Sequence, residues 1–438
     1  MKAVFLCGGI GKRMHPITED KFMLKFLGKT LLEHQIETAI KAGIKDFVII
    51  CNPFNEEKIK NYLHPLKLKV EFALQKEPKG MADAIINAEE FLDGEIIVVN
   101  PNDVFEVTAY EKILDSRRSG CDAVLLGFKV DSYFSGGYFK LDGKGEFVGI
   151  AEKPGEGNEP SDLVNIVVHY HKDAKKFISH LKKLVSENDD VYEKTLGVMA
   201  ADGNKIKVVT YTGYWFAIKY PWHILEIAKY FLDKEYGRIS KTAKISPRAT
   251  IEGKVIIEDN VRVFEGATIK GPCHIGKNSV IGTDVLVWNY SHIGDYCVVG
   301  YSTEVKHSFI GDNCWFHSNY IGDSIIANSC FFGAKTVTAN YRFDEKTVKV
   351  NVGDKRIDTG LDKLGAIMGD DCKTGINASI MPGVKIGPNS IVGPGVVLDK
   401  DLESNKTISV EQQYLIKDNT IKYTSKKEEL MKRLLKGK

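Results

Sequence analysis

The chain of 438 residues contains no apolar run of the length that a membrane-spanning helix needs. Its eight cysteines are scattered, without a Cys-x-x-Cys pair or a short Cys/His spacing, so the sequence argues against a zinc site and favours reduced thiols. Lysine and arginine total 60 against 58 aspartates and glutamates, and this balance gives no indication of nucleic-acid or membrane binding. A strand-like pattern starts at Met1, so we expect no signal peptide and a cytoplasmic location.

The length and the 43% hydrophobic content suit two domains with separate cores. We place a first domain at residues 1–235, a second at residues 236–402 and a tail at residues 403–438. The tail ends in a Lys/Glu-rich helical pattern from Lys426 to Lys438, which is typical of a solvated terminal helix.

The second domain carries a repeat of six residues. Every sixth position from Ile245 to Val305 is isoleucine or valine, and a second run with this spacing extends from Met368 to Leu398 with one threonine. A period of six fits neither an α-helix nor a plain strand, and it predicts a parallel β-helix built of hexapeptide repeats. The polar stretch from Asn340 to Lys363 lacks the period and is predicted to form a loop or arm.

The first domain alternates short apolar runs with amphipathic segments, as in a mostly parallel α/β sheet. The predicted strands are Ala3–Leu6, Phe47–Ile50, Val70–Ala73, Glu95–Val99, Ala123–Phe128 and Lys207–Tyr211. The predicted helices are Thr30–Ala42, Gly80–Phe91 and Pro221–Asp233.

A glycine-rich turn, Cys7–Met14, follows the first predicted strand. Glycines at the end of a strand let backbone N–H groups approach phosphates, and Lys12 and Arg13 add positive charge. Taken alone, a structural turn remains an alternative, because the spacing matches neither the dinucleotide fingerprint nor the P-loop.

The residues that follow, His15–His34, make the turn part of a longer motif that resembles the signature of sugar-1-phosphate nucleotidyltransferases. Further matches come in the same order along residues 1–235, which implies a Rossmann-like α/β fold and transfer of a nucleotidyl group to a sugar 1-phosphate. The resemblance implies a nucleoside triphosphate, a sugar 1-phosphate and Mg²⁺ as ligands. It implies nucleotide contacts from Gly8, Gly9, Gly11, Lys12, Gln75 and Gly80, catalytic charges from Arg13, Lys21 and Asp103 with Asp103 on the metal, and sugar-phosphate contacts from Gly137, Glu152, Lys153 and Asn165.

Several positions depart from the family pattern. The family's second metal ligand is an aspartate in a Trp-x-Asp segment, and here Ala217 replaces it, which should weaken Mg²⁺ binding. Lys12, Asp20, Phe22, Asn102 and Lys219 also differ from the usual residues. One hypothesis is that Lys12 or Lys219 supplies part of the metal's charge. The alternative is a catalytically impaired protein that binds nucleotide or sugar phosphate and serves a regulatory role.

The order of the two domains is similar to that of the bifunctional N-acetylglucosamine-1-phosphate uridyltransferase/glucosamine-1-phosphate N-acetyltransferase, in particular the archaeal type. This resemblance implies a left-handed β-helix, a homotrimer and acetyl-CoA as acyl donor. His317 matches the family's base, and a neutral histidine suits that role near pH 7. The implied acetyltransferase site further comprises Lys306, Tyr320, Ala334, Asn340, Tyr341, Lys346, Thr374 and Gly375.

This second site is also altered. Phe331, Lys335 and Trp288 replace smaller or phosphate-binding residues of the family pattern, so the sequence leaves open whether the β-helix still transfers an acyl group. It leaves the nucleotide base and the sugar open as well, because Gln75 and Gly80 are shared across base specificities. Uridine and N-acetylglucosamine are expected by analogy of architecture only.

Overall fold

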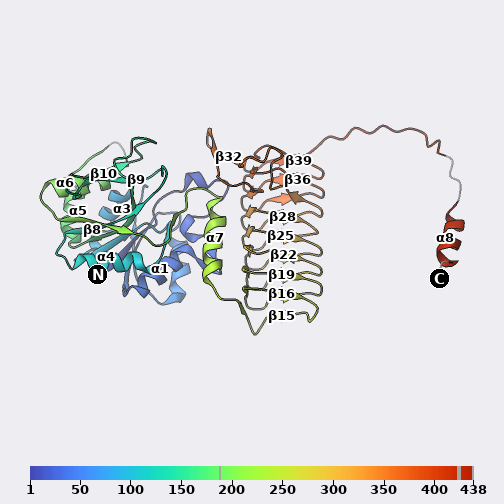
Figure 1. Cartoon of the computed structure of the whole chain (residues 1–438), viewed down its shortest axis with the longest axis horizontal. Helices are drawn as coiled ribbons and strands as arrows, with labels where there is room; N and C mark the ends of the chain where they lie inside the picture. The colour runs from blue at the N-terminus through green and yellow to red at the C-terminus, as the bar shows by residue number, and fades with distance from the viewer. Residues whose placement is uncertain (187–188, 422–425, 437–438) are drawn as a thin grey trace.

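The computed structural model describes residues 1–186, 189–421 and 426–436, and it shows two domains packed side by side with an extended C-terminal tail (Figure 1). The first domain combines a central sheet with helices, and the second is a stack of short parallel strands. Within the described residues, no helix is long and apolar enough to cross a membrane.

The first domain is built on a mixed sheet. Strands follow the order β10-β9-β11-β6-β1-β4-β5, and β8 pairs with both β11 and β12. The bounds are β1 Lys2–Leu6, β4 Asp46–Cys51, β5 Lys69–Leu74, β6 Ile96–Val99, β8 Ala123–Lys129, β9 Gly137–Leu141, β10 Phe147–Glu152, β11 Leu163–His171 and β12 Ile206–Tyr211. All the predicted strands are present. The sequence analysis missed β9, β10 and β11, and β11 runs antiparallel to β6, β8 and β9.

Helices cover this sheet, and two short strand pairs lie beside it (Figure 1). The helices are α1 Leu31–Lys41, α2 Glu56–Leu63, α3 Met81–Asn87, α4 Val107–Arg117, α5 Ala174–Leu181, α6 Val191–Ala201 and α7 His223–Lys234. The strand pairs are β2 Lys25–Phe26 with β3 Lys29–Thr30, and β7 Asp103–Phe105 with β13 Trp215–Ala217. Thr30 begins α1 as its N-cap, since its hydroxyl accepts a hydrogen bond from the Glu33 N–H.

The second domain is a left-handed parallel β-helix with three sheets. The sheet facing the first domain contains β14 Arg238–Ile239, β17 Val255–Ile257, β20 Cys273–Ile275, β23 His292–Ile293, β26 Phe309–Ile310, β29 Ile325–Ile326, β34 Ile367–Met368 and β37 Lys385–Ile386. The second sheet contains β15 Lys244–Ile245, β18 Arg262–Val263, β21 Val280–Ile281, β24 Val298–Val299, β27 Trp315–Phe316, β30 Phe331–Phe332, β35 Lys373–Thr374, β38 Ile391–Val392 and β40 Thr407–Ile408. The third contains β16 Thr250–Glu252, β19 Thr268–Lys270, β22 Leu286–Val287, β25 Glu304–Lys306, β28 Tyr320–Gly322, β31 Val337–Thr338, β36 Ser379–Ile380 and β39 Val397–Leu398.

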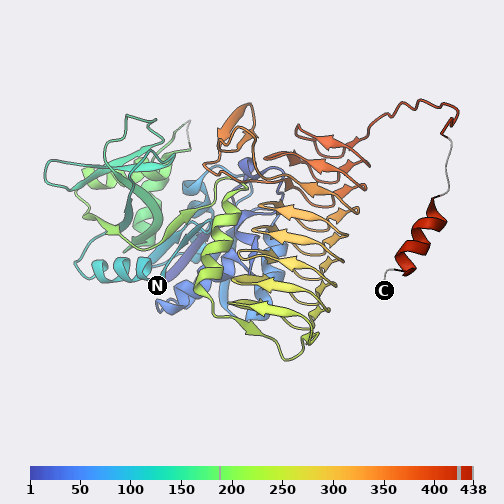
Figure 2. The same cartoon turned by 45° about the vertical axis from the view of Figure 1, so that its right-hand side comes forward.

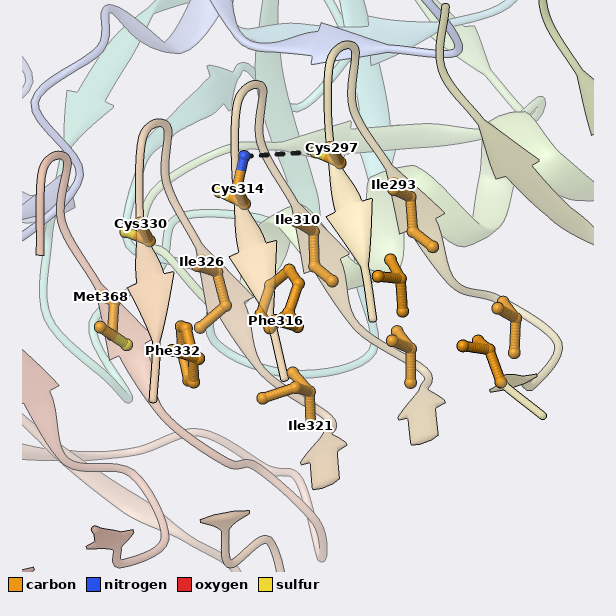
Figure 3. Close-up of a cluster of buried hydrophobic side chains, with 14 of the residues drawn as sticks. Ile293, Cys297, Ile310, Cys314, Phe316, Ile321, Ile326, Cys330, Phe332 and Met368 are labelled. Carbon is orange, nitrogen blue, oxygen red and sulfur yellow. Dashed lines mark hydrogen bonds between the residues drawn. The ribbon is translucent and has the colours of Figure 1, made fainter. Parts of the chain in front are cut away.

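The aliphatic positions of the repeat stack inside the coils, as the period predicts. Ile293, Ile310, Ile326 and Met368 form one such column, and all are fully buried (Figure 3). Buried thiols form a second column, in which each sulfhydryl donates to a backbone carbonyl of the next coil. Cys297 Sγ, for example, lies 3.1 Å from the carbonyl oxygen of Gly311. These cysteines are part of the β-helix core.

The β-helix begins with β14 at Arg238 and continues past residue 402 to β40, so its last strand lies in the segment assigned to the tail. Beyond it the chain is extended as far as residue 421, and the last described element is α8, Lys427–Lys436 (Figure 1). Residues 437–438 of the predicted terminal helix lie outside the described residues. The predicted arm contains a hairpin of β32 Lys349–Val352 and β33 Lys355–Asp358.

An apolar cluster joins the two domains. It contains residues of α7, of the first sheet of the β-helix and of the arm, and α7 lies between the two domains (Figure 2). Val348 and Val350 of the arm are 1% exposed, so the base of the arm is buried within its own chain. Lys25 pairs with Asp312 at 2.7 Å across the same interface.

Candidate active site

The glycine-rich turn after β1 lines a cavity of about 440 Å³. Two side-chain amides hold the turn in place: Asn52 Nδ2 donates to the Gly8 carbonyl at 3.2 Å, and Asn55 Nδ2 donates to the Cys7 carbonyl at 2.9 Å. A Cβ added at Gly9 would meet open space. The turn therefore presents backbone to the cavity, which suits the binding of phosphates.

The predicted base-contacting residues line the same cavity, next to the glycine-rich turn. Gln75 is buried, and its Nε2 donates to the Gly80 carbonyl at 3.0 Å and to Asp83 Oδ2 at 2.8 Å. A Cβ on Gly8 would lie 2.3 Å from Gln75 Oε1, so only glycine allows this approach. Gly80 has a φ of +94°, and a Cβ there would lie 1.8 Å from an Asp189 carboxylate oxygen. Lys12 lines the same cavity.

A second cavity, of about 220 Å³, adjoins the first, because Met81, Asn100 and Asn102 line both. It contains Arg13, Lys21 and Asp103, which are predicted for catalysis, and the residues predicted for the sugar phosphate except Lys153. It also contains residues that the sequence did not single out. Its lining includes Arg13, Lys21, Asp103, Gly137, Glu152, Asn165, Glu193, Trp215, Ala217 and Lys219.

Three cations meet in the second cavity. Burial, and then repulsion by Arg13, lowers the pKa of Lys21 to about 8. The same two causes lower the pKa of Lys219 to about 7, although Asp103 and Glu152 oppose the shift. A polyphosphate bound here would stabilise the charged forms of both lysines.

Asp103 lies at the floor of the cavity on β7. Its Oδ2 accepts from Trp215 Nε1 at 3.2 Å, and its Oδ1 accepts from Asn100 Nδ2 at 3.2 Å. Burial raises the pKa of Asp103 to about 6, against the hydrogen bond from Trp215 and the charge of Lys219. Ala217 lies directly opposite Asp103 in the antiparallel pair of β7 and β13.

These residues do not fit a metal site held by two carboxylates. Both Asp103 oxygens already accept hydrogen bonds, and the residue opposite it, Ala217, has no donor atom. In the described part of the chain, no group of three or more histidine, cysteine, aspartate or glutamate residues is arranged to hold a metal ion.

The predicted sugar-phosphate residues are neighbours on β9, β10 and β11. A Cβ on Gly137 would lie 3.0 Å from Glu152 Oε2 and 3.6 Å from Asn165 Cβ, so glycine keeps space free between them. Glu152 Oε1 pairs with Lys153 Nζ at 2.8 Å. Gly137, Glu152 and Asn165 thus line one cavity, whereas Lys153 follows the end of β10 and does not line it.

A buried histidine behind Asn165 escaped the sequence analysis. His169 Nε2 lies 2.7 Å from Asn165 Oδ1, and His169 Nδ1 lies 2.9 Å from the Tyr192 hydroxyl. Burial lowers the pKa of His169 to about 3, so the ring is neutral and Nε2–H donates to Asn165. β11 is irregular between Ile166 and Tyr170, where His169 approaches Asn165, and this strand was not predicted from the sequence.

Asn100 and Glu193 also line the second cavity and were not predicted from the sequence. Asn100 follows β6 at the carboxyl edge of the sheet, where ligands of open α/β sheets bind, and that position was a usable signal. Glu193 lies on α6, and burial raises the pKa of its carboxyl to about 7. No sequence motif marks Glu193.

In the β-helix, part of the predicted acetyltransferase set is assembled within one chain. Asn340 Nδ2 lies 3.3 Å from the Tyr320 hydroxyl and donates to Asp323 Oδ2 at 2.5 Å. Lys306 ends β25, the strand paired with β28 that Tyr320 begins. Trp288 lies beside Lys306, whose Nζ is 5.8 Å from the indole ring. Tyr341 pairs with Lys363 at the base of the arm, and Lys346 is exposed on the arm.

The remaining residues of the predicted acetyltransferase site lie around the second sheet of the β-helix. His317 is exposed, and its ring centroid lies 5.5 Å from that of Phe331. The Thr374 side chain faces the interior instead, where its hydroxyl lies 2.9 Å from that of Thr336. Ala334 and Gly375 are packed against neighbouring coils through backbone hydrogen bonds. His317 therefore contacts Phe331 of the second sheet, while Lys306 and Asn340 lie beside Tyr320 of the third.

Comparison with known proteins agrees with both halves of the structure. The model of the family described as "Nucleotidyl transferase" matches residues 2–234. The chain belongs to the nucleotidyl transferase family. A second family model, "Bacterial transferase hexapeptide (six repeats)", matches residues 365–400.

Relatives of this nucleotidyl transferase share both domains. "Bifunctional protein GlmU" of Methanocaldococcus jannaschii is 36% identical over 92% of this chain and 96% of the relative. "Bifunctional sugar-1-phosphate nucleotidylyltransferase/acetyltransferase" of Sulfurisphaera tokodaii is 36% identical over 92% of this chain and 98% of the relative. "Bifunctional protein GlmU" of Methanococcus vannielii is 33% identical over 95% of this chain and 99% of the relative.

Proposed function

We propose that residues 1–235 transfer a nucleotidyl group from a nucleoside triphosphate to a sugar 1-phosphate and release pyrophosphate. The observation that carries this proposal is that two cavities adjoin and that the second holds a cluster of cations, Arg13, Lys21 and Lys219. One cavity is lined by a glycine-rich turn and suits a nucleotide. The other has acidic and amide side chains that suit sugar hydroxyls.

In this reaction a phosphate oxygen of the sugar 1-phosphate attacks the α-phosphorus of the triphosphate. A new P–O bond forms on one side while the bond to the pyrophosphate oxygen breaks on the other. The attacking oxygen is already ionised near pH 7, so no general base is needed. Catalysis then rests on alignment of the two substrates and on neutralisation of their negative charges.

Each group has a role that follows from its position. Gly8, Gly9, Gly11 and Lys12 hold the triphosphate, while Gln75 and Gly80 contact the base. Arg13 and Lys21 neutralise the phosphates where the bonds change. Gly137, Glu152, Lys153 and Asn165 orient the sugar phosphate, and His169 fixes the Asn165 amide. Mg²⁺ would enter with the triphosphate, and Asp103 is the carboxylate that the family resemblance assigns to it. We assign no step to a protein-bound metal.

The proposal is tested by pyrophosphate release from each common nucleoside triphosphate with a set of sugar 1-phosphates. UTP with N-acetylglucosamine 1-phosphate is the first pair to try. We expect release with one triphosphate, and its loss in Lys21→Met. Lys144→Met, in an exposed turn, is the matched control and should retain the wild-type rate. Absence of release with every pair, from folded protein, would contradict the proposal and favour a binding or regulatory role.

A second candidate activity is acetyl transfer from acetyl-CoA to an amino-sugar phosphate in the β-helix. The grouping of Lys306, Tyr320 and Asn340 favours it. His317 would take the proton of the amine as its nitrogen attacks the thioester carbon, and coenzyme A would leave as the thiolate. His317 would reach these residues only between neighbouring subunits, so this activity requires a homotrimer.

This activity is tested by incubating the protein with acetyl-CoA and glucosamine 1-phosphate. A thiol reagent then detects the coenzyme A that is released. All eight cysteines of the protein are buried, so the protein thiols contribute little to the signal. We expect release in the wild type and none in His317→Ala. Wild-type protein that releases no coenzyme A would mean that Phe331 and Trp288 have closed the site.

A further inference from the structure

Lys219 occupies the region of the nucleotidyl transfer site in which a second metal-binding carboxylate would lie. Ala217 is the direct partner of Asp103 across β7 and β13, and facing side chains of an antiparallel pair are about 4.5–5.5 Å apart at Cβ. Lys219 follows two residues later and lines the same cavity as Asp103. In place of a carboxylate that would bind a metal cation, the chain thus has the positively charged side chain of Lys219.

Two groups hold the Lys219 ammonium in place. Its Nζ donates to the carbonyl oxygen of Ser135 at 2.5 Å, and it lies 3.1 Å from the ring centroid of Phe134. A carbonyl and an aromatic face both favour a positive charge. The contacting residues come from the loop between β8 and β9, so the head group is held across the cavity and does not extend into solvent.

Lys12 is the other lysine that differs from the family pattern, and its position is different. It lines the nucleotide cavity, is exposed, and does not line the cavity of Asp103. Of the two lysines, only Lys219 lies where a metal held by residues 103 and 217 would act.

We propose that the Lys219 ammonium takes over the charge-neutralising role of the protein-bound metal in this site. The inference rests on the proposed nucleotidyl transfer and adds to it that triphosphate binding depends little on a divalent ion. A positive group on the protein replaces an ion that two carboxylates would otherwise have to capture from solution.

The first test measures metal binding by the full-length protein without nucleotide. Electron paramagnetic resonance of Mn²⁺ is recorded with the wild type and with the double variant Ala217→Asp/Lys219→Val. We expect the wild type to leave Mn²⁺ free, and the double variant to gain affinity about tenfold or more, as restored coordination implies. Wild-type binding as tight as that of the double variant would overturn the proposal.

The second test uses inorganic tripolyphosphate, a probe that needs no knowledge of the base. Its affinity is measured calorimetrically in EDTA and again with Mg²⁺, for the wild type, Lys219→Met and Lys219→Arg. We expect the wild type to bind in EDTA, Lys219→Met to bind about tenfold more weakly, and Lys219→Arg to retain most affinity. Equal affinities of the wild type and Lys219→Met in EDTA would contradict the proposal.

Neither test requires turnover. If no pyrophosphate is released by any substrate pair, the proposed function fails, yet the Mn²⁺ and tripolyphosphate measurements still decide the role of Lys219. If pyrophosphate is released only with a divalent ion, and Lys219→Met leaves its rate unchanged, the proposed function stands and the role of Lys219 is refuted.

Discussion

Asn165 depends on a buried chain of hydrogen bonds for its orientation. The chain runs from His171 through the Tyr192 hydroxyl and His169 to Asn165 Oδ1. Since Oδ1 is occupied by the His169 donor, the Asn165 Nδ2 group is left to donate to a ligand. His169 is therefore a positioning residue for the sugar phosphate.

We expect His169→Phe to lower kcat/KM about tenfold, equivalent to about 1.4 kcal/mol, by raising KM for the sugar 1-phosphate. The KM for the triphosphate should not change, because His169 lies behind the sugar-binding residues. His64→Phe is the matched control, because His64 is exposed and lies outside the buried chain. Steady-state kinetics with each substrate varied in turn checks the prediction, and equal effects of both variants would contradict it.

The lysines of the site predict a pH dependence. Their working form is the ammonium, so activity is present below the pKa of each lysine and is lost as the pH rises through it. With a pKa of about 7 for Lys219 and about 8 for Lys21, kcat/KM measured without added metal should begin to fall near pH 7. Lys219→Arg should move that fall upward toward pH 8. An unchanged profile in this variant would show that Lys219 does not limit activity.

At the scale of single elements, β27 combines an inward and an outward aromatic residue. Phe316 is fully buried and packs on Phe332 at 4.9 Å between ring centroids, whereas its neighbour Trp315 is 45% exposed. We expect Phe316→Ala to cost about 3–5 kcal/mol, because the neighbouring coils prevent collapse of the cavity. Trp315→Ala should cost far less stability. Thermal unfolding of both variants tests this difference, and equal shifts would contradict it.

The arm provides a second element-scale prediction. Val350 is 1% exposed at the interface of the two domains, while Asn351 beside it is exposed. Val350→Lys would place an unpaired charge among apolar side chains, so we expect the arm to detach. Limited proteolysis should then cleave within residues 340–363 faster than in the wild type. Asn351→Lys, the matched control, should show wild-type resistance, and equal resistance of both variants would exclude the packing role of Val350.

The sequence revealed the elements whose burial repeats with a fixed period. The β-helix follows from its aliphatic positions, because each coil buries one residue in six, and the parallel strands of the first domain follow from their apolar runs. The antiparallel strand β11 was missed, since its pattern is locally like other buried strands and its pairing is set by distant parts of the chain. The packing of the arm base between the domains depends on contacts with α7, which no local pattern encodes.

The residues of the candidate site likewise fall into those that local motifs predict and those that only the folded chain brings together. Asp103, Lys21, Glu152 and Asn165 were found because they lie in an ordered set of motifs, and the absence of a carboxylate at Ala217 was visible in the same way. The contacts of Lys219 with Phe134 and Ser135 join positions 84 or more residues apart and appear only in the folded chain. His169 acts through Asn165, so no motif of ligand-binding residues includes it.

At the scale of the whole molecule, the β-helix carries apolar side chains on its outer faces. Trp315 and Phe331 are neighbours on the second sheet with exposures of 45% and 39%, and Ile391, 43% exposed, follows beyond Lys373 on the same sheet. A row of this kind favours burial against other subunits. We expect the mass in solution to be three times the chain mass of 48.9 kDa. Phe331→Glu should shift it toward the monomer, and a monomeric wild type would contradict the trimer.

The central claim is that the first domain joins a nucleotide to a sugar phosphate. The most direct measurement is mass-spectrometric detection of the nucleoside diphosphate sugar formed from the substrate pair that releases pyrophosphate, with and without a metal chelator. We expect product from the wild type under both conditions, and none from Lys21→Met. No product with any pair, from protein that binds tripolyphosphate, would contradict the claim of nucleotidyl transfer.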